Sequence, residues 1–286
     1  MRTAMVGGLR WMGRTLAIVL LVILGSTILV RFAPGYLSDA REMDSRYAAE
    51  ARSELAAEAA HSRSIPRMLL VEIKDAVRGD FGTSRQFGVP VSELIAPRLA
   101  VSGGLLARGI ALAWMLALCA ALLSSAGRKP SMLRQAPATV LLAIPTAALA
   151  TFCLLADWGG PVLVMALLLA ARDFKFLDHA LRTAWAEPHV LQARAQGVPT
   201  GRLLAAHIAP SLAPQLGALA SLSIVTALSA LVPVEVLFNV PGVGELAWNA
   251  ALNRDLPVLL AVMMVMALAV TCSGMATPRA AEWESA

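Results

Sequence analysis

Charged side chains are scarce in this sequence, and their scarcity excludes most soluble folds. Asp, Glu, Lys and Arg make up 15% of the 286 residues, whereas apolar residues make up 58%. The mean hydropathy is +0.68. Soluble domains carry about 25% charged residues. The composition therefore indicates an integral membrane protein.

Aromatic residues and cysteines are also few. Phe, Trp and Tyr make up 5% of the chain, which argues against an outer-membrane barrel, because such barrels carry aromatic girdles on alternating strands. Abundant Leu, Ala and Val favour close-packed helices, so we predict an all-α integral membrane protein. The three cysteines, Cys119, Cys153 and Cys272, fall in apolar runs, where a thiol behaves as a small hydrophobe and indicates neither a disulfide framework nor a metal cluster.

The motifs of common enzymes are missing from the chain. It has no Gly-x-x-x-x-Gly-Lys-Ser/Thr phosphate loop, no His-x-x-x-His or His-Glu-x-x-His arrangement among its four histidines, and no Gly-x-Ser-x-Gly elbow. We therefore expect this chain to bind no nucleotide, metal or other cofactor of its own and not to be an enzyme.

The excess of positive charge does not indicate nucleic-acid binding. The net charge is +5 and the pI is near 9.6, but no basic stripe carries interleaved aromatic residues. Basic residues that flank membrane spans set the orientation of a membrane protein. Membrane lipid, and no nucleic acid, is therefore the expected partner of these side chains.

Uncharged stretches predict about six membrane-spanning helices, since about 20 residues at 1.5 Å each cross the hydrocarbon core. The fourth stretch is short and is extended through Phe176. The long run from Leu203 to Val234 is shortened, because Pro210 and Pro214 are expected to break it. The predicted spans are 15–32, 101–123, 136–156, 159–176, 216–238 and 256–275.

The distribution of basic residues predicts the orientation of these spans. Arginine and lysine are concentrated in residues 1–14, after the second span and in the segment 172–202, which places these segments and both termini in the cytoplasm. Residues 33–100 are too long a segment to obey this rule and are expected to form an external loop ahead of a core membrane domain, 101–286. Because Arg31 follows the first span where a cleavage site would stand, that span is expected to be a retained anchor.

The segment 178–214, between the fourth and fifth spans, is the most informative part of the chain. Within Glu187 to Pro210, Gly197 is expected to end one short helix, and Pro199 or Thr200 to begin the next. This predicts a helix-turn-helix that faces the cytoplasm. Taken alone, the pattern favours a surface hairpin that covers the bundle over a docking element.

The same segment resembles the EAA loop of permeases of ATP-binding cassette importers. Ala193-Arg-Ala-Gln-Gly197 is similar to the Ala-Arg-Ala-x-Gly core of the dipeptide/oligopeptide/nickel branch, and the arginine, histidine and proline that follow match it too. The resemblance implies an importer-permease (MetI-like) bundle whose cytoplasmic helix couples to an ATPase. The coupling residues it implies are Ala193, Arg194, Ala195, Gly197, Arg202, His207 and Pro210.

Other segments match this family in the same order along the chain. The matching segments are Arg31-Phe-Ala-Pro-Gly35, Gly79-Asp-Phe-Gly-Thr-Ser84, Val234-Glu-Val-Leu-Phe-Asn-Val-Pro-Gly-Val-Gly244 and Asn253-Arg-Asp-Leu-Pro257. Three features depart from the family: Pro199 replaces a serine, Ala209 replaces a leucine, and the external loop after the third span is short. These departures leave the choice of solute open.

Two charged residues fall inside or beside predicted spans. Glu235 lies near the outer end of the fifth span and Arg108 lies within the second, and charges at such places tend to face protein or a water-filled cavity. Each is either a pathway group or a structural anchor, and for Arg108 snorkelling to the membrane surface is a further explanation. For Glu235 the family resemblance implies a structural anchor beside the turn with Pro241, Gly242 and Gly244.

The family resemblance implies a multi-pass transport subunit of the bacterial cytoplasmic (inner) membrane. Its implied partners are a second permease, two ABC ATPase subunits that bind ATP and Mg²⁺, and an extracytoplasmic substrate-binding protein. The implied solutes are di- or oligopeptides, nickel complexes or other small solutes. Two alternatives stay open: an ion-coupled carrier that uses Glu235 and Arg108 as relay groups, and an intramembrane enzyme, for which the chain lacks a recognisable nucleophile and base.

Overall fold

The structure is a computed structural model that describes residues 81–84, 86–125, 131–253 and 255–274 and the single positions 13, 17, 21 and 25. Apart from those single positions, the predicted span 15–32 lies outside the described residues, as do residues 33–80 of the predicted external loop. The chain forms two compact units. The loop unit contains the residues up to Ala96 and Asn249–Leu268, and the bundle unit contains Pro97–Trp248 and the residues from Ala269.

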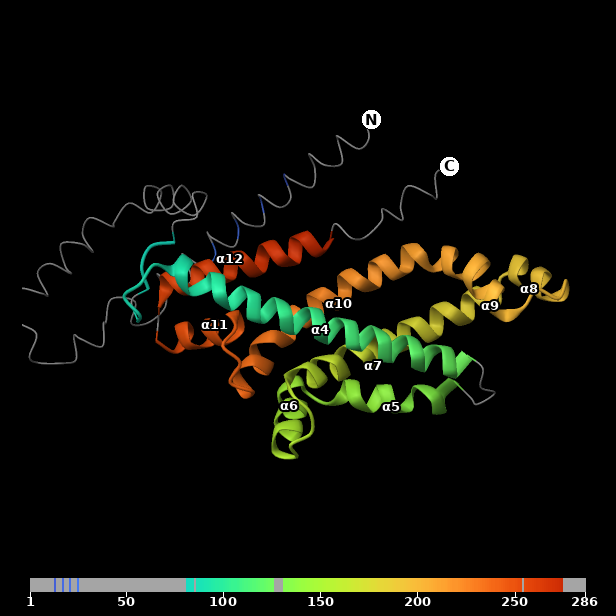
Figure 1. Ribbon diagram of the computed structural model, residues 1–286, viewed down its shortest axis with the longest axis horizontal. Helices are drawn as coiled ribbons and strands as arrows, with labels where there is room; N and C mark the ends of the chain where they lie inside the picture. The colour runs from blue at the N-terminus through green and yellow to red at the C-terminus, as the bar shows by residue number, and fades with distance from the viewer. Residues whose placement is uncertain are drawn as a thin grey trace, which may run out of the picture. The chain divides into compact units, whose positions relative to one another are not determined.

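The described residues are almost entirely helical, which confirms the predicted helical fold (Figure 1). The helices are α4 (Val91–Ser125), α5 (Ser131–Ala143), α6 (Thr146–Leu155), α7 (Pro161–Trp185), α8 (Pro188–Ala195), α9 (Thr200–Leu203), the π-helix η2 (Leu204–Ile208), α10 (Ala209–Leu237), α11 (Val243–Leu252) and α12 (Leu256–Ser273).

Three of the described helical stretches are long and apolar enough to cross a membrane, namely 91–124, 200–237 and 256–273. The bent pair 133–143 and 146–155 makes a fourth if it is counted as one span. Helix α7 fails the same criterion because its second half is charged, although its first half is apolar. The expected number of six spans therefore stays a prediction.

Two predicted spans begin or end at other residues than expected. Helix α4 begins at Val91, so residues 91–100, predicted as external loop, are helical. Helix α7 continues to Trp185, through the predicted start of the cytoplasmic loop at residue 178. Neither Gly nor Pro interrupts α7 after its first residue, and the helix ends only where Pro188 disfavours helical backbone in the residue before it.

The prediction that Pro210 and Pro214 break the fifth span is wrong. The helical stretch is continuous from Thr200 to Leu237. The backbone N–H of Ala209 donates to the carbonyl of Leu204, five residues earlier, which is the wider spacing of a π-helix. The helix therefore continues through Pro210, although this residue has no backbone N–H to donate.

The third predicted span, 136–156, is not one straight helix. Its two halves, α5 and α6, meet at 91°, and Figure 1 shows α6 turned away from the direction of α5. Pro145 stands at the break with φ −58° and ψ 141°, which is extended backbone. Hydropathy could not show this break, because both halves are apolar.

Small residues let the helices of the bundle unit approach one another. Ala117 and Ala121 on α4 lie in one buried cluster with Phe174 and Leu177 of α7 and with residues of α5, α8, η2 and α10. Gly109 on α4 is closer still: a Cβ atom at this position would lie 2.6 Å from Cγ of the buried Met165. The chain packs α4 against α7 through this glycine.

The loop unit joins two of the family-like motifs. The hydroxyl of Ser84 donates to Oδ2 of the buried Asp255, and the backbone N–H of Gln86 donates to the same oxygen at 3.1 Å. Ser84 ends the Gly79–Ser84 motif, and Asp255 belongs to the Asn253–Pro257 motif. The fold thus brings together two segments that lie far apart in the sequence.

Gly109→Ala is expected to lower the melting midpoint of the detergent-solubilised protein relative to Gly103→Ala. Both changes raise helix propensity by about 1 kcal/mol, so this contribution cancels. A Cβ at Gly103 meets no atom within 4 Å, whereas one at Gly109 overlaps Met165. Overpacking of this kind costs about 1–3 kcal/mol. Equal midpoints for the two variants would contradict the close approach of α4 to α7.

Candidate functional site

The segment between α7 and α10 is a helical hairpin with Gly197 at its turn. Gly197 has a φ of +82°, which favours glycine. The N–H of Val198 donates to the carbonyl of Ala193 at 3.2 Å, and the N–H of Gly197 donates to that of Arg194 at 3.0 Å. This pair of bonds is a Schellman motif, which satisfies the last carbonyls of α8. The local sequence therefore dictates where α8 ends.

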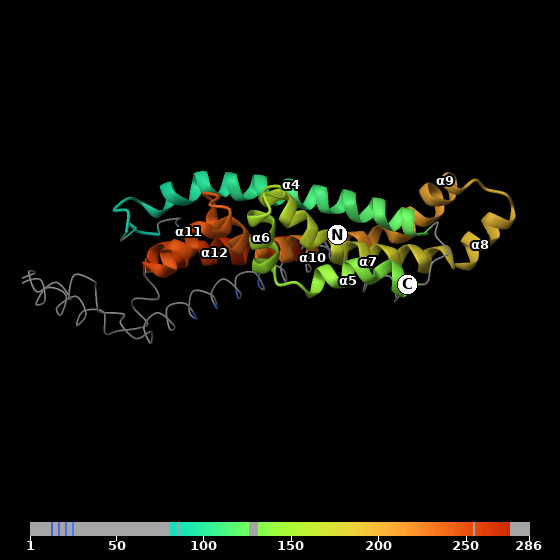
Figure 2. The same cartoon turned by 90° about the horizontal axis from the view of Figure 1, so that it is seen from below.

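One side of this hairpin is part of the bundle core. The buried residues are Val190 and Ala193 on α8, Leu203 on α9 and Ile208 on η2. Val190 and Ile208 belong to the same buried cluster as Leu181 of α7. Figures 1 and 2 show α8 and α9 at one end of the bundle, beyond the ends of α7 and α10.

The other side of the hairpin is exposed. Leu191 is 51% exposed, although it is a large apolar residue on a polar helix. Of the residues expected to couple, Ala193 is buried and His207 is half-buried, and the exposed ones are Arg194, Ala195, Gly197, Arg202 and Pro210. The predicted coupling residues therefore do not share one surface.

Two histidines of the hairpin stack on each other. The ring centroids of His189 and His207 lie 6.4 Å apart with an interplanar angle of 25°. His189 Nδ1 also lies 3.2 Å from an oxygen of the Glu187 carboxylate. The contact joins the start of α8 to η2, so it helps to close the hairpin. Among the described residues, no group of three or more His, Cys, Asp or Glu could hold a metal.

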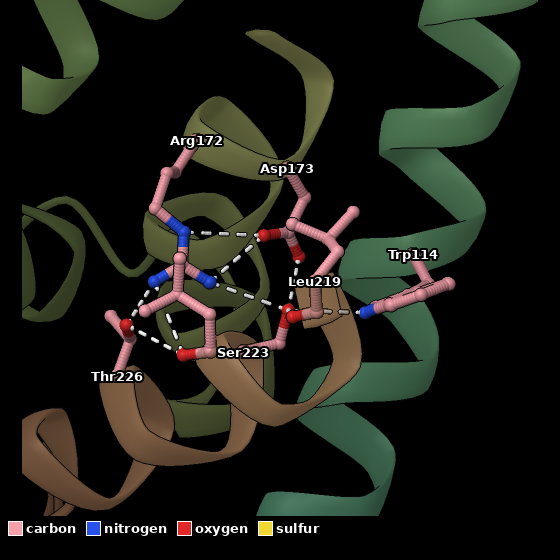
Figure 3. A network of polar contacts seen from close by, with 7 residues as sticks. Trp114, Arg172, Asp173, Leu219, Ser223 and Thr226 are labelled. Carbon is pink, nitrogen blue, oxygen red and sulfur yellow. Dashed lines mark hydrogen bonds and ion pairs between the residues drawn. The ribbon is translucent and has the colours of Figure 1, made fainter. Parts of the chain in front are cut away.

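A network of polar side chains lies between α7, α10 and α4 (Figure 3). Nη2 of Arg172 lies 3.0 Å from Oδ1 of the fully buried Asp173. Arg172 also donates to the hydroxyl of Thr226, and the hydroxyl of Ser223 donates to Oδ2 of Asp173 at 3.0 Å. From α4, the indole N–H of Trp114 donates to Ser223 at 3.3 Å.

This network lies about halfway along α7 and in the second half of α4. Trp114 stands in the middle of the predicted span 101–123, and the network joins it directly to α7 and α10. A charge at the centre of a bilayer costs about 2.5–3.5 kcal/mol on insertion scales, so intramembrane charges are paired and mark functional positions. The Arg172–Asp173 pair is therefore part of the candidate site.

A second network ties the ends of three helices together. The carboxylate of the buried Asp178 accepts from the hydroxyl of Ser124 at the end of α4, from Nε2 of Gln135 on α5 at 3.3 Å, and from Nε of Arg182 one turn later in α7 at 3.1 Å. Arg134 donates to the carbonyl of Ser124 at 3.1 Å. These contacts lie at the end of the bundle that carries the hairpin.

The carboxylate of Glu235 caps the N-terminus of α11. It accepts from the N–H of Gly244 at 2.7 Å, from the N–H of Glu245 at 3.2 Å and from the hydroxyl of Ser102 on α4 at 2.6 Å. The side chain is fully buried. A carboxylate is favourable at this place because the first N–H groups of a helix are unpaired and its dipole is positive there.

The turn before α11 leaves no room for side chains. A Cβ atom at Gly242 would overlap the Glu235 carboxylate, and one at Gly244 would lie 2.9 Å from the Cα of Val232. Pro241 is exposed at the start of the turn. The glycines of this motif therefore allow the turn to lie close to α10, because any larger residue would clash with it.

Arg108 differs from these buried groups. Its side chain is exposed on α4, and its Nε donates to the carbonyl of Gly104 in the same helix at 2.9 Å. The structure does not bring Arg108 into the Glu235 cap, whose contacts come from Ser102 and from α11.

The sequence matches the family described as "Binding-protein-dependent transport system inner membrane component" over residues 109–283. The chain belongs to this family. A protein of Brucella suis biovar 1 named as a peptide permease is 26% identical over 91% of this chain and 90% of its own length. The oligopeptide transport system permease protein OppB of Escherichia coli strain K12 is 26% identical over 68% of this chain and 71% of its own length. The family resemblance seen in the sequence is thus confirmed.

Two groups of the candidate site were missed in the sequence. Arg172 and Asp173 fall in both the predicted span 159–176 and the basic segment 172–202, and neither was predicted as a site residue, although they follow directly on eleven uncharged residues of α7. One signal in the sequence could have identified them. The apolar stretch before Arg172 is too short to cross a membrane, so the span must include this pair of opposite charges. The contact between Ser84 and Asp255 had no such signal.

Asp173→Asn is expected to destabilise the protein by about 3–5 kcal/mol, because it leaves the Arg172 guanidinium without its carboxylate. The double change Arg172→Gln with Asp173→Asn removes both charges and is expected to cost less than the single change. Melting midpoints in detergent and the yield of monodisperse protein measure both. A double variant at least as unstable as Asp173→Asn would contradict the pairing.

Glu235→Gln is expected to cost about 1–3 kcal/mol of stability, because the amide cannot accept every hydrogen bond that the carboxylate accepts. The same change at Glu93, an exposed residue in the first turn of α4, is the matched control and is expected to have a smaller effect. Thermal unfolding of both variants in detergent compares them. Equal midpoints would show that Glu235 does not stabilise the turn.

Proposed function

We propose that this chain is the membrane-spanning permease of an ATP-driven importer whose solutes are peptides or related small solutes. Family membership supports the transport role. The solute class is supported by relatives named as a peptide permease and as an oligopeptide transport permease, which match the chain over most of its length.

In this proposal the chain works with other subunits in the bacterial inner membrane. A second permease completes the pathway, an extracytoplasmic binding protein delivers the solute, and two ABC ATPase subunits bind ATP and Mg²⁺. Six spans with both termini in the cytoplasm agree with the basic segments that flank the hairpin. The chain itself carries no phosphate-loop motif, so hydrolysis belongs to the partners.

The observation that carries the coupling proposal is the two-sided hairpin. Its inner side, with Val190, Leu203 and Ile208, is part of the bundle core. On its outer side Leu191 and Arg194 are exposed, and in this proposal that side faces the cytoplasm. An ATPase that binds the outer side therefore pushes on side chains that are packed into α7 and α10.

The helices behind the hairpin are long enough to carry this movement to the membrane centre. Helix α7 has 25 residues, which is about 37 Å at 1.5 Å per residue. The Arg172–Asp173 network joins α7 to α10 about halfway along α7. In this proposal the two helices move together between outward-open and inward-open packings, and ligands shift the balance by binding these states unequally.

The ion-coupled alternative has less support from the geometry. A relay group must be able to take up and release a proton, and Glu235 is fully buried with hydrogen bonds to Ser102, Gly244 and Glu245. These contacts are those of a helix cap. We therefore propose Glu235 as a structural anchor of the turn.

Leu191→Asp is expected to reduce both the co-purification of an ATP-hydrolysing subunit and solute uptake at least tenfold. It places a charge on the exposed side of the hairpin without entering the core. Thr183→Asp, on the exposed side of α7 just before the hairpin, is the matched control and is expected to leave both unchanged. The measurements are ATPase activity of the affinity-purified complex and uptake by cells.

The coupling proposal fails if the tagged wild-type chain brings down no ATPase. It also fails if Leu191→Asp keeps wild-type uptake, or if Thr183→Asp loses as much as Leu191→Asp does. Melting midpoints of the isolated chains show that both variants fold.

A further inference from the structure

Arg108 is an exposed charge on an apolar helix. From Leu99 to Ser125 it is the one charged residue of α4. Its Nε donates to the carbonyl of Gly104, and no described carboxylate forms an ion pair with it. The two terminal nitrogens of its guanidinium, Nη1 and Nη2, are therefore left for a partner outside the described chain.

Three other arginines on the long helices α4 and α7 form ion pairs. Arg98, Arg172 and Arg182 each lie 2.9 to 3.1 Å from a carboxylate of the same unit. Arg108 stands six residues before Trp114, which is about 9 Å along the helix, so it lies inside the predicted span on the N-terminal side of the central network. A charge at such a depth requires either water or an anion.

The surface around Arg108 is open. Ala107 and Ala111, each within one turn of Arg108 along α4, are small and exposed. A Cβ atom added at Gly104 would lie 3.5 Å from Nη2 of Arg108, so the guanidinium lies beside this glycine. An extended chain could therefore lie close to the helix backbone with one end at the guanidinium.

We propose that Arg108 binds the C-terminal carboxylate of a peptide on its way through the transporter. The inference rests on the proposed function, since it requires that the solutes be peptides. A carboxylate matches the pair Nη1 and Nη2, because two parallel N–H groups bind its two oxygens. Every linear peptide with a free C-terminus carries this group, whatever its side chains. Arg108 thus recognises the common end of the peptide and leaves its sequence free.

The test compares uptake of a pool of tripeptides with free C-termini and the same pool as C-terminal amides, by the complete transporter in its native host. Wild type is expected to prefer the free acids. Arg108→Gln is expected to lower the uptake of free acids about tenfold, with the loss mainly in KM, and to leave the uptake of amides unchanged. Arg108→Lys is expected to restore part of the preference, because it keeps the charge without the paired donors.

Arg98→Gln is the matched control, since Arg98 lies on the same helix but pairs with Glu245. It is expected to change the uptake of acids and amides by the same factor. Equal losses for both pools in Arg108→Gln, as a contact with the second permease would cause, overturn the inference. Unchanged uptake of both, as lipid-facing snorkelling would give, overturns it too. If wild type imports neither pool, the proposed peptide function itself fails, which separates the two conclusions.

Discussion

Two adjacent residues of opposite charge, Arg172 and Asp173, lie about halfway along α7, after eleven uncharged residues. Their charges are tolerated there because Ser223 and Thr226 of α10 complete the hydrogen bonds of the pair. Because α10 supplies these hydrogen bonds, separating α7 from α10 at this level would leave polar atoms of the pair without partners, which is costly in a bilayer. The packing of the long helices, and any movement that they share, depends on this constraint.

Buried carboxylates with hydrogen-bond donors from neighbouring segments also connect helices elsewhere in the bundle unit. Asp178 holds the end of α4 and the start of α5 on α7, and Glu235 closes the turn before α11. Each joint buries a carboxylate that donors of neighbouring helices satisfy, as buried polar groups require. Such contacts hold neighbouring helices in fixed positions relative to each other. A transporter changes between discrete packings, so groups of helices held in this way are expected to move as units.

Local chemistry explains which features could be predicted. Gly197 ends α8 because its positive φ and the Schellman bonds are local properties of a few residues. The break at Pro145 was missed and the break expected at Pro210 was predicted wrongly, because a proline removes one donor in either case. Whether the helix bends or absorbs the loss depends on its neighbours. Arg172 and Asp173 were missed because a pattern of charge along the chain does not show which charges face each other.

The amino-acid sequence by itself determined that this protein is a helical membrane protein of the importer-permease family, because hydropathy and ordered motifs are properties of the chain alone. It also determined the hairpin turn at Gly197. Only the tertiary structure decided that Glu235 caps α11, that Asp173 accepts a hydrogen bond from Ser223 of α10, and that Arg108 forms no ion pair with a described carboxylate. The physical reason is that the cost of a charge at membrane depth depends on the groups that surround it, and folding brings those groups from distant segments.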